Sequence, residues 1–181
     1  MSVSLPEISP LLAESRLNDL GPGSPNLAVR RQLQDLASSL AAKAKNRDFA
    51  LACLAGLWLL HDFQDESHAI SQELDTVEGS YWHGILHRRE PDYWNAKYWF
   101  RRVPAHPILP PLCKEAAALT NDAGAPAGSE FLTHQKTWNA AAFVDLCEQA
   151  ARGPVALGLL CRRIQRREWE LLFAYCHERA F

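Results

Sequence analysis

The sequence lacks the patterns that mark membrane proteins, disulfide-bonded scaffolds and nucleic-acid-binding proteins. Its longest apolar run, residues 49–60, is well short of the ~20 residues that a membrane-spanning helix needs. The five cysteines are odd in number and no two are spaced as CxxC, which argues against a disulfide framework and against a cysteine-based zinc site. The net charge of −2 argues against broad electrostatic binding to nucleic acid or acidic membranes.

Motifs that would name an activity are also missing. The fingerprints GxGxxG, GxxxxGKS/T, HExxH and GxSxG do not occur. The N-terminus shows no basic stretch followed by an apolar one, so we expect no signal peptide. We therefore expect a cytoplasmic protein with reduced, buried thiols, whose function must be sought in local clusters of side chains.

The residue types that are present favour an all-α fold. β-branched residues are scarce, alanine and leucine dominate, and apolar residues recur at helical spacing. The length of 181 residues suits a single domain. We expect an N-terminal arm over residues 1–25, rich in proline and glycine, and one helical domain over residues 26–181. The prediction is an irregular bundle of six to seven helices, over residues 26–45, 46–77, 81–90, 92–102, 111–120, 137–151 and 155–179.

The near-neutral net charge hides two oppositely charged segments. Residues 61–80 carry six carboxylates and no lysine or arginine, whereas residues 81–103 carry five basic and two acidic side chains. If their helices pack side by side, these charges can form an ion-pair network that locks the helices together. Glu168 lies on an apolar line of the last expected helix, so it needs a partner, and an arginine from residues 88–102 would serve.

The basic segment also holds most of the aromatic excess. Three of the six tryptophans and three of the four tyrosines lie in residues 81–100, interleaved with arginines. Arginines beside flat rings suit planar or anionic ligands, through bidentate hydrogen bonds and cation–π stacking. The alternative is an aromatic corner of the core with arginine stems packed on it. The predicted ligand-binding residues are Arg88, Arg89, Tyr93, Asn95, Lys97, Trp99, Arg101 and Arg102.

Histidine spacing predicts a catalytic or metal site in the same region. On a helix, His83, His87 and Glu90 project within about 40° of one another, and histidine suits proton transfer near neutral pH. We predict these three as catalytic residues. A preceding helix would offer a second trio, and two such helices can build a site for zinc, iron or manganese. The alternative is two solvated polar faces. The predicted metal ligands are His61, Asp65, His68, His83 and His87.

One segment resembles the signature of a known group of sequences. Residues 80–103, SYWHGILHRREPDYWNAKYWFRRV, are similar to the signature of an uncharacterised bacterial and fungal protein family. The upstream residues 61–68, HDFQDESH, and the His106-Pro107 pair belong with it. The resemblance covers roughly residues 57–107 and implies no activity. It implies that this region is the functional one.

Two functions follow as hypotheses. The first is a pocket between the helices of residues 57–77 and 81–102 that binds a small polar or anionic molecule, with a divalent metal ion and a catalytic role. The second is a non-catalytic interaction or structural module, in which the same charges form ion pairs and a partner surface. Neither hypothesis involves nucleic acid or a membrane.

Overall fold

A computed structural model describes residues 7–13 and 16–181 of the chain. Over these residues the fold is all-helical, without strands, and contains ten α-helices and one short 3₁₀ helix, Leu27–Val29. The α-helices are α1 (Ser9–Ala13), α2 (Arg30–Lys43), α3 (Arg47–Leu60), α4 (Gln64–Ser71), α5 (Val77–Arg89), α6 (Tyr93–Arg101), α7 (Leu109–Asp122), α8 (Phe131–His134), α9 (Ala140–Ala150) and α10 (Val155–Ala180).

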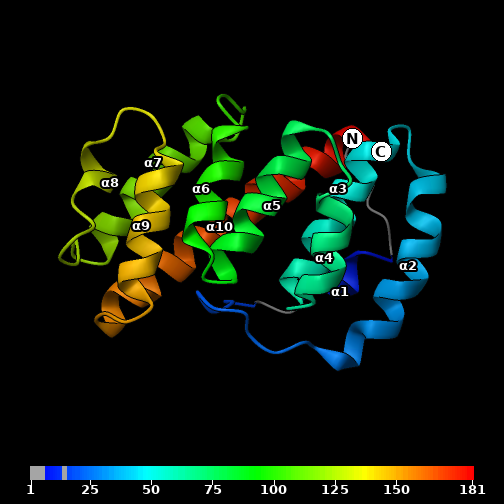
Figure 1. The fold of residues 1–181 in the computed structure, drawn as a ribbon, viewed down its shortest axis with the longest axis horizontal. Coiled ribbons are helices and arrows are strands. Elements are labelled where there is room, and N and C mark those ends of the chain that lie inside the picture. The colour runs from blue at the N-terminus through cyan, green and yellow to red at the C-terminus, as the bar shows by residue number, and fades with distance from the viewer. Residues whose placement is uncertain (1–6, 14–15) are drawn as a thin grey trace.

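The longest helix, α10, joins the two ends of the molecule. Its 26 residues correspond to about 39 Å of helix, and it packs against α7 and α9 near its start and against α3 near its end. In Figure 1 it crosses the molecule behind α5 and α6, which occupy the middle. Each end has its own apolar core: one joins α7, α8, α9 and the start of α10, and the other joins α2, α3, α5 and the end of α10.

The predicted number of helices is too low, for two physical reasons. The helices α1 and α8 have five and four residues, too few to show a helical period. The single helix expected over residues 46–77 is instead broken after Leu60, and α4 starts at Gln64. Asp62 at this break has φ of +63°, in the left-handed region that aspartate tolerates better than most residues.

The described part of the N-terminal arm belongs to the folded body. Ile8, Leu11 and Leu20 are buried, and the segment after residue 15 runs along the break between α3 and α4. Asn18 donates hydrogen bonds to the Leu60 carbonyl (2.9 Å) and to the Asp62 carboxylate (2.8 Å). The first six residues of the predicted arm lie outside the described part of the chain.

Two glycines allow α5 to lie close to its neighbours. A Cβ atom on Gly56 of α3 would come within 2.7 Å of the Trp82 indole, and one on Gly84 within 3.1 Å of the Phe100 ring on α6. The absence of side chains at these glycines therefore lets α5 pack tightly between α3 and α6. None of the described helices is long and apolar enough to cross a membrane.

Candidate metal centre

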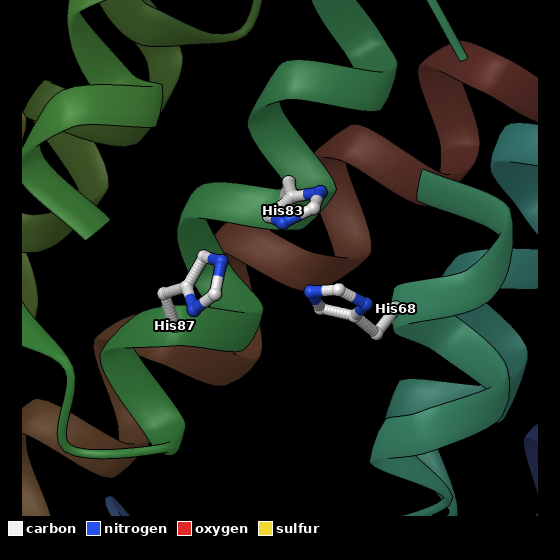
Figure 2. A group of neighbouring side chains, drawn as sticks. All are labelled: His68, His83 and His87. Carbon is white, nitrogen blue, oxygen red and sulfur yellow. The ribbon is translucent and has the colours of Figure 1, made fainter. Parts of the chain in front are cut away.

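Three histidines meet where α4 faces α5. His68 comes from α4, and His83 and His87 come from consecutive turns of α5. One ligand nitrogen of each ring lies within 4.8 Å of the other two. Figure 2 shows a nitrogen of each ring turned toward the space between them. Among the residues that the structure describes, this is the one group of three or more histidine, cysteine or acidic side chains close enough to share a metal ion.

The start of α5 brings the histidines into this position. The side chain of Thr76 caps the helix by accepting a hydrogen bond from the Gly79 N–H (3.0 Å), so α5 begins at Val77. The sequence predicted a start at Tyr81. The earlier start adds a turn of helix before His83, which places both α5 histidines well inside the helix, where their backbone positions are fixed.

The His83 ring is held on two sides. It stacks on the Trp99 indole of α6, with ring centroids 4.1 Å apart and planes 22° apart. Its Nδ1 lies 3.3 Å from the Ser71 hydroxyl, which in turn donates to the His68 carbonyl (3.4 Å). When the Ser71 hydroxyl donates to that carbonyl, its oxygen is the acceptor for His83 Nδ1–H. The lone pair of His83 is then on Nε2, the nitrogen available to a metal ion.

The His87 ring is also contacted at both nitrogens. Its Nδ1 lies 2.9 Å from a carboxylate oxygen of Glu90, close in distance although poorly directed for a hydrogen bond. Its Nε2 lies 3.0 Å from the Asn95 amide nitrogen on α6. A carboxylate can only accept, so the proton of neutral His87 belongs on Nδ1. The lone pair again belongs to Nε2, and a carboxylate behind the distal nitrogen is the usual arrangement behind a metal-binding histidine.

Both α5 histidines are held in the neutral form that a metal ion requires. Burial, together with the nearby His87 and His68, lowers the pKa of His83 to about 3. Burial also lowers the pKa of His87, against the opposing effect of the Glu90 and Asp92 charges. At neutral pH each of these imidazoles therefore keeps one nitrogen lone pair, and no carboxylate lies among the three clustered nitrogens.

The other two predicted metal ligands lie elsewhere. The break after Leu60 turns His61 away from His68: its Nε2 lies 3.0 Å from the Leu11 carbonyl and its Nδ1 3.3 Å from the Asn26 amide. Asp65 is exposed to solvent and outside the cluster. The i, i+4 and i+7 spacing of this trio presumed one continuous helix, and the chain is not helical at Asp62 and Phe63.

Two of the predicted ligand-binding arginines are buried in ion pairs. Arg88 lies 2.5 Å from Glu168 of α10, and these two side chains are 1% and 0% exposed. The expected arginine partner of Glu168 is therefore Arg88. Arg89 lies 2.5 Å from Asp62 and also donates to the Leu59 carbonyl (2.9 Å). The interactions found here are those of the ion-pair alternative.

The remaining predicted ligand-binding residues belong to α6 or to the residue that ends it. Asn95 and Trp99 contact the histidine cluster, and the Arg102 guanidinium lies over the Trp99 ring at 5.3 Å. Lys97 and Arg101 face a separate cavity beside α9. Tyr93 is half-buried and contacts the apolar core.

Sequence reasoning missed Ser71, which orients His83. A signal was available, because Ser71 follows His68 by three residues and so shares its helix face.

Comparison of the chain with models of protein families, with curated proteins and with solved structures finds no match. The functional inference therefore depends on the geometry of the cluster.

Proposed function

We propose that this protein binds one divalent transition-metal ion, zinc foremost, through His68, His83 and His87. The observation that supports this most is the convergence of three imidazole nitrogens from two helices, with the pKa of His83 and of His87 lowered. Neutral imidazole is a preferred ligand of zinc, and it also suits iron and copper. The three rings contact one another, and no carboxylate lies among their clustered nitrogens.

The spacing of the rings fits metal binding after a small closure. Zinc–nitrogen bonds of about 2.1 Å at tetrahedral angles place the nitrogens roughly 3.4 Å apart. The separations here are at most 4.8 Å, so the nitrogens need to approach one another by no more than roughly 1.4 Å. His68 is the half-buried member of the trio and has the greatest freedom to move, whereas His83 is fixed between Trp99 and Ser71.

The number of protein ligands supports a catalytic rather than a closed structural site. Structural zinc sites have four protein ligands, and catalytic sites have three and leave one position for water or a substrate oxygen. Asn95 would give up its contact with His87 Nε2 when that nitrogen binds the metal. Its amide would then be free to hydrogen-bond to a molecule at the open position. We therefore propose a metal-dependent enzyme acting on a small polar or anionic substrate, by hydrolysis or hydration.

The surroundings of the cluster fit such a substrate. Trp99 presents a flat ring beside His83, and Arg102 lies over that ring with about half of its side chain exposed.

Five free, buried cysteines fit a reducing compartment, so we propose the cytoplasm as the place of action. The second candidate is a non-catalytic module, favoured by the ion pairs of Arg88 and Arg89.

Calorimetric titration of the metal-free protein with zinc tests the proposal. We expect one site per chain, and a loss of affinity of about a hundredfold or more in His83→Asn and His87→Asn, beyond the range typical of outer partners. His134→Asn is the matched control, because His134 is exposed and outside the cluster. Equal binding by all variants, or none by the wild type, would overturn the proposal.

Cobalt absorption separates the catalytic from the structural function. Cobalt in a three-histidine site with an open position should change its visible spectrum when azide is added, because azide enters the vacant position. A spectrum unchanged by azide would favour the non-catalytic module. The His83→Asn protein should show neither the cobalt bands nor the azide response.

A further inference from the structure

A second cavity lies on the other side of α6 from the histidine cluster. Its volume is about 270 Å³, just below the 300–1,000 Å³ typical of small-molecule sites. It lies between α6 and the start of α9, with Phe100, Trp138 and Tyr81 among its aromatic walls. Trp99 contacts the histidines, whereas the adjacent Phe100 lines this cavity, so the two sites are separate.

The cavity wall contains a buried hydrogen-bond donor without an acceptor. Trp138 is only 8% exposed, and its indole Nε1–H has no hydrogen-bond partner. Because this nitrogen is itself out of contact with solvent, the indole ring and not the N–H is what Trp138 presents to the cavity. Ala140 and Ala141, which also line the cavity, belong to the first turn of α9, where backbone N–H groups lack acceptors within the helix.

The charge of the lining is positive. Lys97 and Arg101 line the cavity, and no aspartate or glutamate is among the lining residues that the structure describes. Lys97 is paired with Asp145, which lies outside the lining. Arg101 is exposed and has no carboxylate partner in the described part of the chain; its guanidinium lies 5.7 Å from the Tyr98 ring centroid. A guanidinium without an acidic partner can bind an incoming carboxylate in a bidentate manner.

We propose that this cavity binds a small organic anion, a planar ring that carries a carboxylate. The ring would pack against Phe100 and the Trp138 indole, and the carboxylate would accept hydrogen bonds from the Arg101 guanidinium. A neutral ring would leave Arg101 without an anion. An inorganic anion would leave the aromatic walls without an apolar partner. The proposal goes beyond the metal centre and does not depend on it.

Benzoate is the probe for the test, and benzamide is its neutral counterpart of nearly the same shape. The indole N–H groups of the six tryptophans give separate signals in a ¹H–¹⁵N spectrum of the full-length ¹⁵N-labelled protein. The signal of Trp138 is assigned through Trp138→Phe. We expect benzoate to shift this signal saturably, and benzamide to shift it far less at the same concentrations. The other five indole signals report that the fold is intact.

Two arginine variants decide whether the charge matters. Arg101→Gln should weaken benzoate binding about tenfold or more, because it removes a charge-assisted hydrogen bond. Arg163→Gln is the matched control, an exposed arginine of α10 outside the cavity lining, and should bind as the wild type does. Calorimetry of these variants gives the same comparison without Trp138→Phe, should that variant not fold.

Three results would overturn the proposal: no saturable shift with benzoate, equal shifts with benzoate and benzamide, or unchanged affinity in Arg101→Gln. Benzoate binding should survive His83→Asn, because the two sites are separate. Failure of the metal proposal and failure of this one are thus distinguishable.

Discussion

Two polar clusters on α5 differ in how their charges are balanced. On one side of the helix, Arg88 and Arg89 are buried, and each lies 2.5 Å from a carboxylate. On the other side, His83 and His87 are also buried and meet a third histidine, His68, with no carboxylate among their clustered nitrogens. Each arginine has a carboxylate that balances its charge, although Nε and Nη1 of Arg88 have no hydrogen-bond partner. The histidine cluster is a set of donors that a metal ion would complete.

The comparison also distinguishes two reasons for a buried polar residue. A buried ion pair fixes how helices pack, and removing one partner leaves an uncompensated charge. His83 and His87, whose lowered pKa values keep them neutral, leave no buried charge that a partner must compensate. Neighbouring residues of a single helix thus serve the fold and the proposed function separately.

The largest expected effect is on the ion pairs. Glu168→Gln leaves Arg88 buried without an anion and should lower the free energy of unfolding by about 3–5 kcal/mol. Urea denaturation measures the loss. Glu170→Gln is the control, because Glu170 forms only partly exposed pairs, and should cost no more than about 1 kcal/mol. Equal losses in the two variants would mean that Arg88 and Glu168 do not carry the stability assigned to them.

Zinc should stabilise the protein through the histidines and not through the ion pairs. At a free zinc concentration a hundred times the dissociation constant, the folded state should gain about 2.7 kcal/mol. The thermal unfolding midpoint measures this gain. Glu170→Gln should show the full gain and His87→Asn none. A gain that persists in His87→Asn would place the metal elsewhere.

The Glu90 carboxylate gives a smaller effect on the same cluster. Because it lies beside His87 Nδ1, Glu90→Gln should weaken zinc binding by about 10- to 100-fold. Glu73→Gln makes the same change of charge at an exposed position just after α4, and should leave the affinity unchanged. Equal weakening by both substitutions would point to a general charge effect rather than to orientation of His87.

How far the sequence could predict these clusters depends on which interactions are local. Helical period predicted the helices that became α2, α7, α9 and α10, because each buries a regular apolar stripe. The spacing of His83 and His87 correctly placed them on one helix face. The buried partner of Glu168 could also be narrowed to a short arginine-rich segment, since a carboxylate on an apolar stripe needs a cation.

The break that separates His61 from His68 could not be predicted, because distant residues stabilise it. Asp62 adopts a left-handed conformation whose carboxylate accepts hydrogen bonds from Arg89 of α5 and Asn18 of the arm. Neither partner is near Asp62 in sequence. For the same reason, only the folded chain shows that His68 alone of its predicted trio faces α5.

The smallest expected effect is a dependence of stability on pH at a half-buried pair. Burial raises the pKa of Glu78, but the His106 imidazole 3.5 Å away and hydrogen bonds from the backbone N–H of Glu78 itself and from Thr76 outweigh burial and hold the pKa below its ordinary value. A lowered pKa in the folded state contributes stability above the unfolded-state pKa of about 4.3, and that contribution is lost as the pH falls through the folded-state value.

Glu78→Gln removes this contribution and should lower the free energy of unfolding at neutral pH by less than about 1 kcal/mol. The difference from the wild type should shrink as the pH falls below about 4. Urea denaturation across this range measures it. A difference that grows on acidification would contradict the assigned direction of the pKa shift.

Metal stoichiometry tests the central claim most directly. The purified protein is dialysed against a small molar excess of zinc and then against metal-free buffer. Elemental analysis then measures its zinc content, and the His83→Asn and His134→Asn proteins are treated in the same way. The histidine cluster predicts one zinc ion per chain in the wild type and in His134→Asn, and none in His83→Asn. Zinc-free wild-type protein, or equal zinc in all three proteins, would contradict the metal centre.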